Sequence, residues 1–193
     1  CRQLARTAGP ERQTAYLNQA KLALTRALAG LAQHPEGASR QAWLQCLLGE
    51  IRLELGDLAE VRTDLRNLLE DPNLGVRANY LCGQAARRQG DYAAAMEHFE
   101  RVFQLAQGQE GLTLSLDTLL SLAELEQERG ECALALVYCR RAAQVAELLS
   151  DLAGLTKAQV GAAEALIGLG IAAPDRTRAA ATEAAESLVR LNF

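Results

Sequence analysis

Glycine recurs at regular distances along this chain, and that period constrains the fold more than any other feature of the sequence. Gly56 and Gly90 each precede an aspartate and lie 34 residues apart (90 − 56 = 34). Gly130 and Gly170 follow at steps of 40 residues (130 − 90 and 170 − 130). Such spacing is typical of stacked supersecondary units, each of which buries its apolar face against its neighbours. We therefore expect an array of repeated units.

Each unit is expected to be a pair of helices joined by a tight turn. Residues 74–88 predict a helix, because apolar side chains recur on its neighbouring turns, and Gly90 can adopt the left-handed conformation that ends a helix. Asp91 should then cap the following helix by accepting a backbone N–H bond. In the preceding copy of this pattern, Asp57 and Glu60 predict a capping box in its aspartate variant.

The second helix of the pair is expected to supply the residues that fill the space between the helices. Ala95 is predicted to be small because the two helices approach each other closely at that point. Tyr92, Phe99 and Phe103 fall on one stripe of the same helix and should pack against the first helix.

The composition favours an all-α protein. Ala, Leu, Arg, Glu and Gln dominate and are strong helix formers, whereas Phe, Trp and Tyr together make up only 4% of the residues. Hydrophobic residues account for 49% and charged residues for 23%, so the chain has enough apolar surface to form a core and is not disordered by composition. The net charge of -4 argues against a general attraction to nucleic acid or to anionic lipid.

The clearest copy of the pattern covers residues 81–99, LCGQAARRQGDYAAAMEHF. It has a small residue after Leu on the first helix, Gly-Asp at the turn and Ala-x-x-x-Phe on the second helix. In these features the chain resembles the tetratricopeptide repeat (TPR) family. The resemblance implies a single array over residues 1–193, folded as a right-handed α-α superhelix of antiparallel helix pairs. We expect repeats at residues 42–73, 76–106, 116–150 and 156–193, preceded by an N-terminal helix or half repeat at residues 11–33.

The two steps of 40 residues are longer than the usual repeat and resemble the long repeats of bacterial regulators. We expect the six additional residues to lie between the second helix of one unit and the first helix of the next, where they lengthen the helices. In the fourth unit the second helix is predicted to begin near Pro174 or Asp175. Trp43 lies two places before the tryptophan position of the family, so we expect it to face outward or into a groove.

No residue pattern predicts catalysis, a cofactor or a metal site. The five cysteines form no CxxC pair and are odd in number, which argues against a disulfide framework and favours a reducing compartment. Cys82, Cys132 and Cys139 are expected to be small buried hydrophobic residues. A metal site that combines two of them with His98 lacks adequate ligand spacing, and His34 is expected in a loop. Phosphate-binding loops and hydrolase motifs are absent from the sequence.

The TPR resemblance also implies a concave surface that is lined by the first helix of every unit and binds a partner. The predicted groove residues of the first three units are Trp43, Glu50, Leu53, Glu54, Arg77, Tyr80, Gln84, Arg87, Arg88, Asp117, Leu120, Glu124, Gln127 and Glu128. Cys46 of the first unit and Lys157, Val160, Glu164 and Ile167 of the fourth unit extend this set. Chaperone-binding members clamp a carboxylate with Asn at positions where this chain has Glu or Gln, so that ligand is disfavoured.

The function expected from this pattern is that of a non-enzymatic scaffold, which binds a protein or peptide in the concave groove. Leu53, Tyr80 and Leu120 would supply apolar contacts, and Arg87 and Arg88 would bind acidic residues. One alternative is the sensory or regulatory segment of a larger bacterial signalling or transcription-regulating protein. Another is self-association through the C-terminal end, whose apolar residues are Leu188, Val189, Leu191 and Phe193.

The sequence also carries expectations about location. It contains no apolar run long enough for a membrane span or a signal peptide core, which favours a cytoplasmic protein with no membrane insertion. The first residue is Cys1 instead of Met, so a segment of a longer or processed protein is expected. A lipoprotein with Cys1 as its mature end is the alternative.

Overall fold

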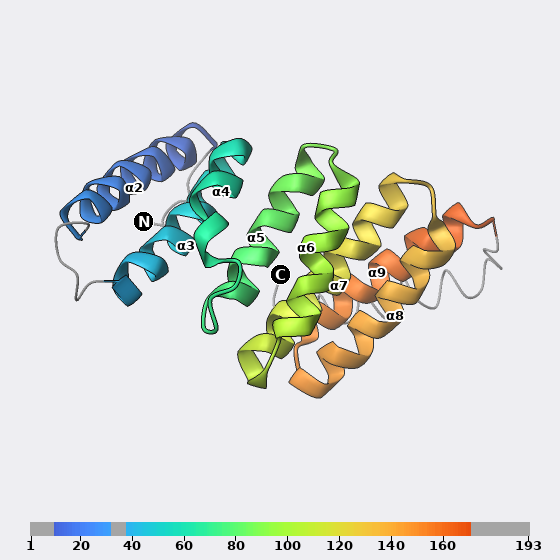
Figure 1. Cartoon of the computed structure of the whole chain (residues 1–193). Coiled ribbons are helices and arrows are strands. Elements are labelled where there is room, and N and C mark those ends of the chain that lie inside the picture. The colour runs from blue at the N-terminus through green and yellow to red at the C-terminus, as the bar shows by residue number, and fades with distance from the viewer. Residues whose placement is uncertain (1–9, 32–37, 171–193) are drawn as a thin grey trace. The chain divides into compact units, whose positions relative to one another are not determined.

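The computed structural model describes residues 10–31 and 38–170, and within these ranges all regular secondary structure is helical (Figure 1). The helices are α2 (Pro10–Leu31), α3 (Ala38–Leu55), α4 (Leu58–Asp64), the 3-10 helix η2 (Arg66–Leu68), α5 (Gly75–Arg88), α6 (Tyr92–Leu105), α7 (Gly108–Glu128), α8 (Cys132–Leu149) and α9 (Leu152–Gly168). The prediction of an all-α protein is confirmed. None of the helices in these ranges is sufficiently long and apolar to cross a membrane.

The chain forms two compact units, and the boundary between them falls within α6, after Arg101. The predicted helix at residues 74–88 corresponds to α5, and α2 covers the described part of the predicted helix at residues 11–33. The second helix of the fourth repeat, the apolar C-terminal end, His34 and Cys1 all lie outside the described residues.

Left-handed residues end the helices at the predicted turns. Gly56, Gly90 and Gly130 have φ of 86°, 76° and 81°, values that residues with a Cβ rarely adopt. After α5, the N–H of Gly90 donates to the carbonyl of Arg87 at 2.9 Å and the N–H of Asp91 donates to the carbonyl of Ala86 at 3.0 Å. This pair of bonds is the Schellman motif, which satisfies carbonyls left open at the helix end. The same two bonds close the turns after α3, α7 and α8.

The capping predictions have mixed outcomes. Asp91 accepts a bond from the N–H of Ala94 at 3.2 Å, as predicted. The capping box at Asp57 is wrong, because this carboxylate makes no cap bond and instead lies 2.8 Å from the ammonium of Lys21. That ion pair ties α2 to the turn between α3 and α4. Long-range attraction has therefore replaced the local cap.

In the first unit, glycines on the first helix of each hairpin face large side chains of the second helix. A Cβ on Gly49 of α3 would lie 3.0 Å from Leu65, and one on Gly83 of α5 would lie 2.5 Å from the ring of Phe99. Both large side chains are fully buried, as is Ala95 of α6. The prediction that the two helices of the pair approach each other closely near Ala95 is therefore confirmed.

The predicted aromatic stripe on α6 is only partly correct. Phe99 is fully buried, but Phe103 is 39% exposed and lines a pocket with residues of α7 and α8. Tyr92, at the start of α6, is half-buried.

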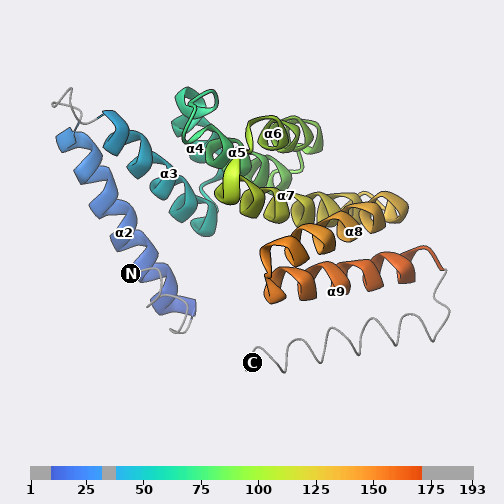
Figure 2. The same ribbon diagram turned by 90° about the horizontal axis from the view of Figure 1, so that it is seen from below.

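In the second unit, α7, α8 and α9 lie side by side, each antiparallel to the next (Figures 1 and 2). Three glycines recur every seven residues on α9, at Gly154, Gly161 and Gly168. A Cβ on Gly161 would lie 2.9 Å from the sulfur of Cys139 on α8, and one on Gly168 would collide with the sulfur of Cys132. Gly161 and Gly168 thus allow α8 and α9 to approach closely, whereas a Cβ on Gly154 would meet Leu116 of α7.

Helix length accounts for the longer steps of the period. Helix α7 has 21 residues, whereas the equivalent first helix α5 has 14. Because α6 ends at Leu105 and α7 begins at Gly108, the additional residues extend the start of α7, as predicted. Helix α7 contacts both α8 and α9.

Gly90→Val is expected to lower the free energy of unfolding by about 1–2 kcal/mol, because a β-branched residue would have to adopt the left-handed backbone conformation of this turn. A Cβ at this position would have no atom within 4 Å, so the cost comes from the backbone and not from a clash. Urea unfolding followed by circular dichroism measures the change. Gly90→Asn is the control, since Asn tolerates this conformation. Equal losses for the two variants would contradict the argument.

Candidate functional site

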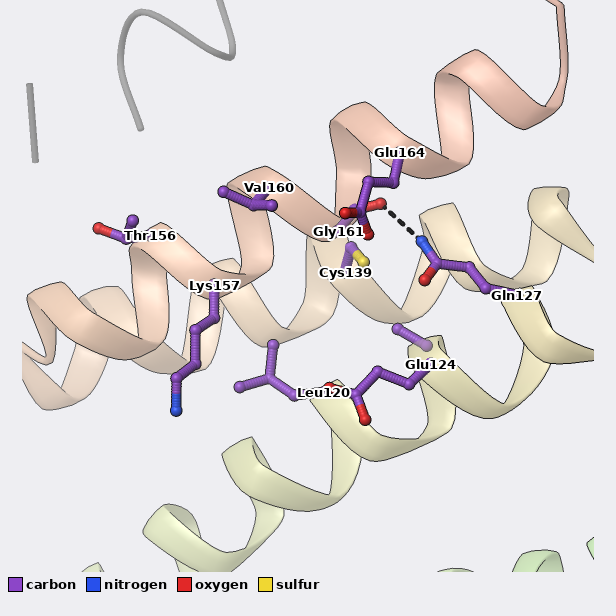
Figure 3. A pocket seen from close by; sticks show the side chains of 10 residues that line it. Leu120, Glu124, Gln127, Cys139, Thr156, Lys157, Val160, Gly161 and Glu164 are labelled. Atoms are coloured by element: carbon purple, nitrogen blue, oxygen red, sulfur yellow. Dashed lines mark hydrogen bonds between the residues drawn. The ribbon is translucent and has the colours of Figure 1, made fainter. Parts of the chain in front are cut away.

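A pocket of about 300 Å³ lies between α7 and α9 in the second unit, with α8 beneath it (Figure 3). Helices α7 and α9 provide the two walls, and the side chain of Cys139 from α8 lies between them. The lining residues are Leu120, Ala123, Glu124 and Gln127 of α7, Cys139 of α8, and Thr156, Lys157, Val160, Gly161 and Glu164 of α9.

Helical spacing explains why these side chains gather at one place. Residues three, four and seven apart share one face of a helix, and the lining residues of α7 and α9 follow this spacing. The space itself comes from small residues, because Ala123 and Gly161 have little or no side chain at the centre of the two walls. Leu120 and Val160 make much of the remaining surface apolar.

A hydrogen bond joins the two walls of the pocket. The side-chain amide of Gln127 on α7 donates from Nε2 to the backbone carbonyl of Gly161 on α9 at 3.0 Å (Figure 3). This bond fixes the orientation of the Gln127 amide, since its nitrogen is committed to the carbonyl. It also ties α7 to α9 where they flank the sulfur of Cys139.

The charges along the pocket are not evenly distributed. Glu124 of α7 and Glu164 of α9 lie on opposite walls at the end near Gln127, whereas Lys157 lies toward the other end (Figure 3). Burial raises the pKa of Asp117, and the nearby ammonium of Lys157 partly opposes that rise. One end of the pocket therefore carries two carboxylates, and the other end carries a lysine with an aspartate close by.

The Cys139 thiol is not suited to nucleophilic chemistry. Burial, together with the nearby carboxylates of Glu164 and Glu124, raises its pKa to about 11. The thiol consequently stays protonated at neutral pH, whereas a reactive cysteine needs the thiolate. The pKa values of Cys46 and Cys82 are raised to about 11 and about 12 by burial in the first unit.

The cysteines and histidine of the described chain have structural roles. Cys82 and Cys139 are buried as predicted, whereas Cys132 is only half-buried, and all of these are free thiols. The prediction that Cys46 lines the groove is wrong, because this free thiol is buried in the core of the first unit. His98 lies 3.1 Å from the side-chain oxygen of Asn79, and burial, with help from Arg62, lowers its pKa. Within residues 10–31 and 38–170, no cluster of His, Cys, Asp or Glu is arranged to hold a metal ion.

The arginines that were predicted to line the groove of the first unit make contacts within the chain. Arg77 of α5 forms an ion pair with the buried carboxylate of Glu50 on α3, with Nε at 2.8 Å from Oε1. Arg88 donates from Nη1 to the backbone carbonyl of Leu53 at 2.6 Å. These two residues therefore hold α5 against α3. Arg87 is half-buried.

The predicted apolar residues of the first unit differ in exposure. Trp43 is 52% exposed, in agreement with the prediction that it faces away from the core. Leu53 is only 8% exposed and belongs to the core, so the prediction that it offers a contact surface is wrong. Tyr80 is half-buried, and its hydroxyl accepts a bond from the amide of Gln84 at 3.1 Å. Glu54 is exposed at the end of α3.

In the second unit the structure brings most of the predicted groove residues together. Leu120, Glu124 and Gln127 line the pocket, Asp117 lies near Lys157 at one end, and Glu128 is exposed and does not line the pocket. The sequence interpretation missed four lining residues, which are Ala123, Cys139, Thr156 and Gly161. The regular recurrence of glycine on α9 was a signal for Gly161, because small residues mark close approach of helices.

A second pocket of the same unit, of about 400 Å³, contains none of the predicted groove residues. It is lined by Phe103, Ser115, Leu119, Tyr138, Arg141, Gln144 and Val145. Arg141 is the one charged residue that lines this pocket, and α9 contributes no residue to the lining. The pocket between α7 and α9 is therefore the better candidate for recognition.

Comparisons with protein-family models, with curated proteins and with solved structures give no match to this chain. The TPR interpretation accordingly depends on the residue pattern and on the helical hairpins described above. The function has to be argued from the pocket itself.

Proposed function

We propose that this chain is a non-enzymatic scaffold built of TPR-like hairpins, which binds a segment of a partner protein along α7 and α9. The observation that carries the proposal is the pocket between these two helices. In a right-handed TPR superhelix the first helices of consecutive repeats line the concave face. Helices α7 and α9 are the first helices of the third and fourth predicted repeats, and they contribute nine of the ten residues that line the pocket.

The size and chemistry of the pocket support binding instead of catalysis. A volume of about 300 Å³ is at the lower end of the range for small-molecule sites and is sufficient for one large side chain of a bound segment. Its apolar walls would remove such a side chain from water, while Glu124, Lys157 and Glu164 at the rim would select it. The protonated thiol of Cys139 adds apolar surface to the base of the pocket.

Selection of random peptides displayed on phage tests the proposal. The immobilised chain should enrich peptides, and Val160→Trp should weaken their binding at least about tenfold, which corresponds to 1.4 kcal/mol, because the indole would fill the pocket. Val160 is 40% exposed at the wall, so the substitution should leave the fold intact. Fluorescence anisotropy with the enriched peptides measures the affinity.

Leu148→Trp is the matched control, since Leu148 is a highly exposed residue of α8 outside the pocket. It should bind the selected peptides as well as the unmodified chain does. If no peptide is enriched, or if both tryptophan variants bind the enriched peptides equally, the proposal is wrong. Circular dichroism of both variants confirms that the helices are retained.

A further inference from the structure

A side-chain amide with a fixed orientation lines the pocket between α7 and α9. Gln127 on α7 donates from Nε2 to the backbone carbonyl of Gly161 on α9 at 3.0 Å. A carbonyl oxygen can only accept, so the nitrogen of the amide must face Gly161 and the oxygen must face away from it. In Figure 3 the amide oxygen of Gln127 accordingly points toward the Glu124 side of the pocket. The pocket therefore presents a hydrogen-bond acceptor in a fixed direction.

No donor of the described chain reaches this acceptor. Among residues 10–31 and 38–170, the bond to Gly161 is the one hydrogen bond of the Gln127 side chain. The hydroxyl of Thr156, which also lines the pocket, donates to the carbonyl of Leu152 at 2.8 Å, and the thiol of Cys139 is a weak donor. An occupant that displaces water from the amide oxygen and brings no donor would leave it unsatisfied, which is unfavourable.

The surface around the acceptor is mainly apolar. Leu120 and Ala123 on α7 and Val160 on α9 contribute to the two walls, and the protonated thiol of Cys139 adds apolar surface between them. The volume of about 300 Å³ is sufficient for one large side chain. A matching side chain is therefore large and apolar, with a single donor.

We propose that this pocket binds a tryptophan side chain of the partner segment, with the indole between Leu120 and Val160 and its ring N–H donating to Oε1 of Gln127. This inference rests on the proposed function, because it names the residue type that the scaffold recognises. The indole has one polar group, and that group is a donor only. Tryptophan also buries a large apolar area and is enriched among the residues that dominate binding at interfaces.

Other side chains match the pocket less well. Aliphatic side chains and phenylalanine have no donor, and asparagine and glutamine bring a carbonyl that needs a donor of its own. Lysine and arginine carry three and five donors, more than one amide oxygen can accept, together with a charge that would lose water. Tyrosine can donate, but its ring is smaller than the indole and covers less of the apolar walls.

Nuclear magnetic resonance with small probes tests the inference on the full chain labelled with nitrogen-15. The probes are the N-acetyl, N-methylamide derivatives of tryptophan, 3-benzothienylalanine and tyrosine. In 3-benzothienylalanine a sulfur replaces the indole N–H, so the shape is nearly the same and the donor is absent. We expect the tryptophan derivative to shift the backbone amide of Gly161 and the side-chain amide of Gln127 in a saturable manner. The benzothienyl derivative should bind at least about tenfold more weakly, and the tyrosine derivative should also bind more weakly than tryptophan.

Gln127→Met should abolish the preference for tryptophan over 3-benzothienylalanine, because methionine has a similar length and no strong acceptor. The substitution also removes the bond to Gly161, but a resulting change in the shape of the pocket would alter the affinities of both probes alike. The ratio of the two affinities therefore reports the acceptor. Gln19→Met is the matched control, since Gln19 is an exposed residue of α2 in the first unit, and it should retain the preference.

Four results would overturn the inference: equal binding of tryptophan and 3-benzothienylalanine, tighter binding of tyrosine, no saturable shift with any probe, or a preference that survives Gln127→Met. None of them decides the proposed function, which the peptide selection tests by itself. Selected peptides that lack tryptophan but are weakened by Val160→Trp would leave the scaffold function and reject the tryptophan occupant. Failure of the selection would reject the scaffold function.

Discussion

Phe99→Ala is expected to lower the free energy of unfolding by about 3–5 kcal/mol, the usual cost of truncating a buried Phe to Ala. The ring of Phe99 on α6 is fully buried and lies against Gly83 of α5, where a Cβ would be only 2.5 Å from Cε1. The ring of Tyr80 flanks it, with the two centroids 6.4 Å apart. Alanine would leave a cavity between α5 and α6 that these neighbours cannot close.

Urea unfolding monitored by circular dichroism at several protein concentrations measures the loss. Phe103→Ala, one turn further along α6, is the control, because Phe103 is 39% exposed and should therefore lose less apolar burial than Phe99. We expect the midpoint to fall for Phe99→Ala with little change in the urea dependence of the free energy. Losses of similar size at the two positions would show that the ring does not hold α5 and α6 together.

The same contact gives a reciprocal expectation at Gly83. In the unmodified chain Gly83→Ala should be destabilising, since the added carbon overpacks against the ring of Phe99. In the Phe99→Ala background the added carbon would enter the cavity, so the loss should shrink or reverse. A double-mutant cycle reports this coupling directly, and additive effects would contradict the contact.

The sequence predicted the turns well because their cause is local. A residue with positive φ is needed to end a helix and reverse the chain, and glycine meets that need at Gly56, Gly90 and Gly130. The turn between α8 and α9 has the same hydrogen bonds but uses Ser150, with φ of 55°. Serine gives no such signal, so that turn could not be located from the period.

The sequence did not predict contacts between segments that are far apart along the chain. The carboxylate of Asp57 binds Lys21, which is 36 residues earlier in the chain, instead of capping α4. Nothing near Asp57 in the sequence identifies this partner. Phe103 likewise follows the helical stripe of Phe99 but lies in the other unit, where it lines a pocket.

The sequence predicted which helix faces line the candidate site, but not which residues are in contact there. The TPR resemblance selected Leu120, Glu124 and Gln127 on α7, and the structure places them on one wall of a pocket. It also selected Lys157, Val160 and Glu164 of α9, which lie on the opposite wall. It did not select Gly161 or Cys139, which lie where α9 approaches α8 closely. Helical periodicity alone does not report such an approach.

Arg77→Ala is expected to lower the free energy of unfolding by about 1–3 kcal/mol, because Arg77 satisfies a carboxylate that the fold has buried. Glu50 is held in α3 with little exposure, and the guanidinium of Arg77 on α5 donates to it from both Nε and Nη2. The groove prediction assigned Arg77 to partner binding, for which Arg77→Ala should leave stability unchanged. Urea unfolding therefore distinguishes the two roles.

A second substitution identifies the charge as the cause. Adding Glu50→Gln to Arg77→Ala removes the buried carboxylate that has lost these donors, so the double variant should be more stable than Arg77→Ala alone. Arg140→Ala is the control, because Arg140 is exposed on α8 and its loss should change stability by no more than about 0.5 kcal/mol. If Arg77→Ala behaves like Arg140→Ala, the ion pair contributes nothing to the fold, and Arg77 becomes a candidate for contact with the partner again.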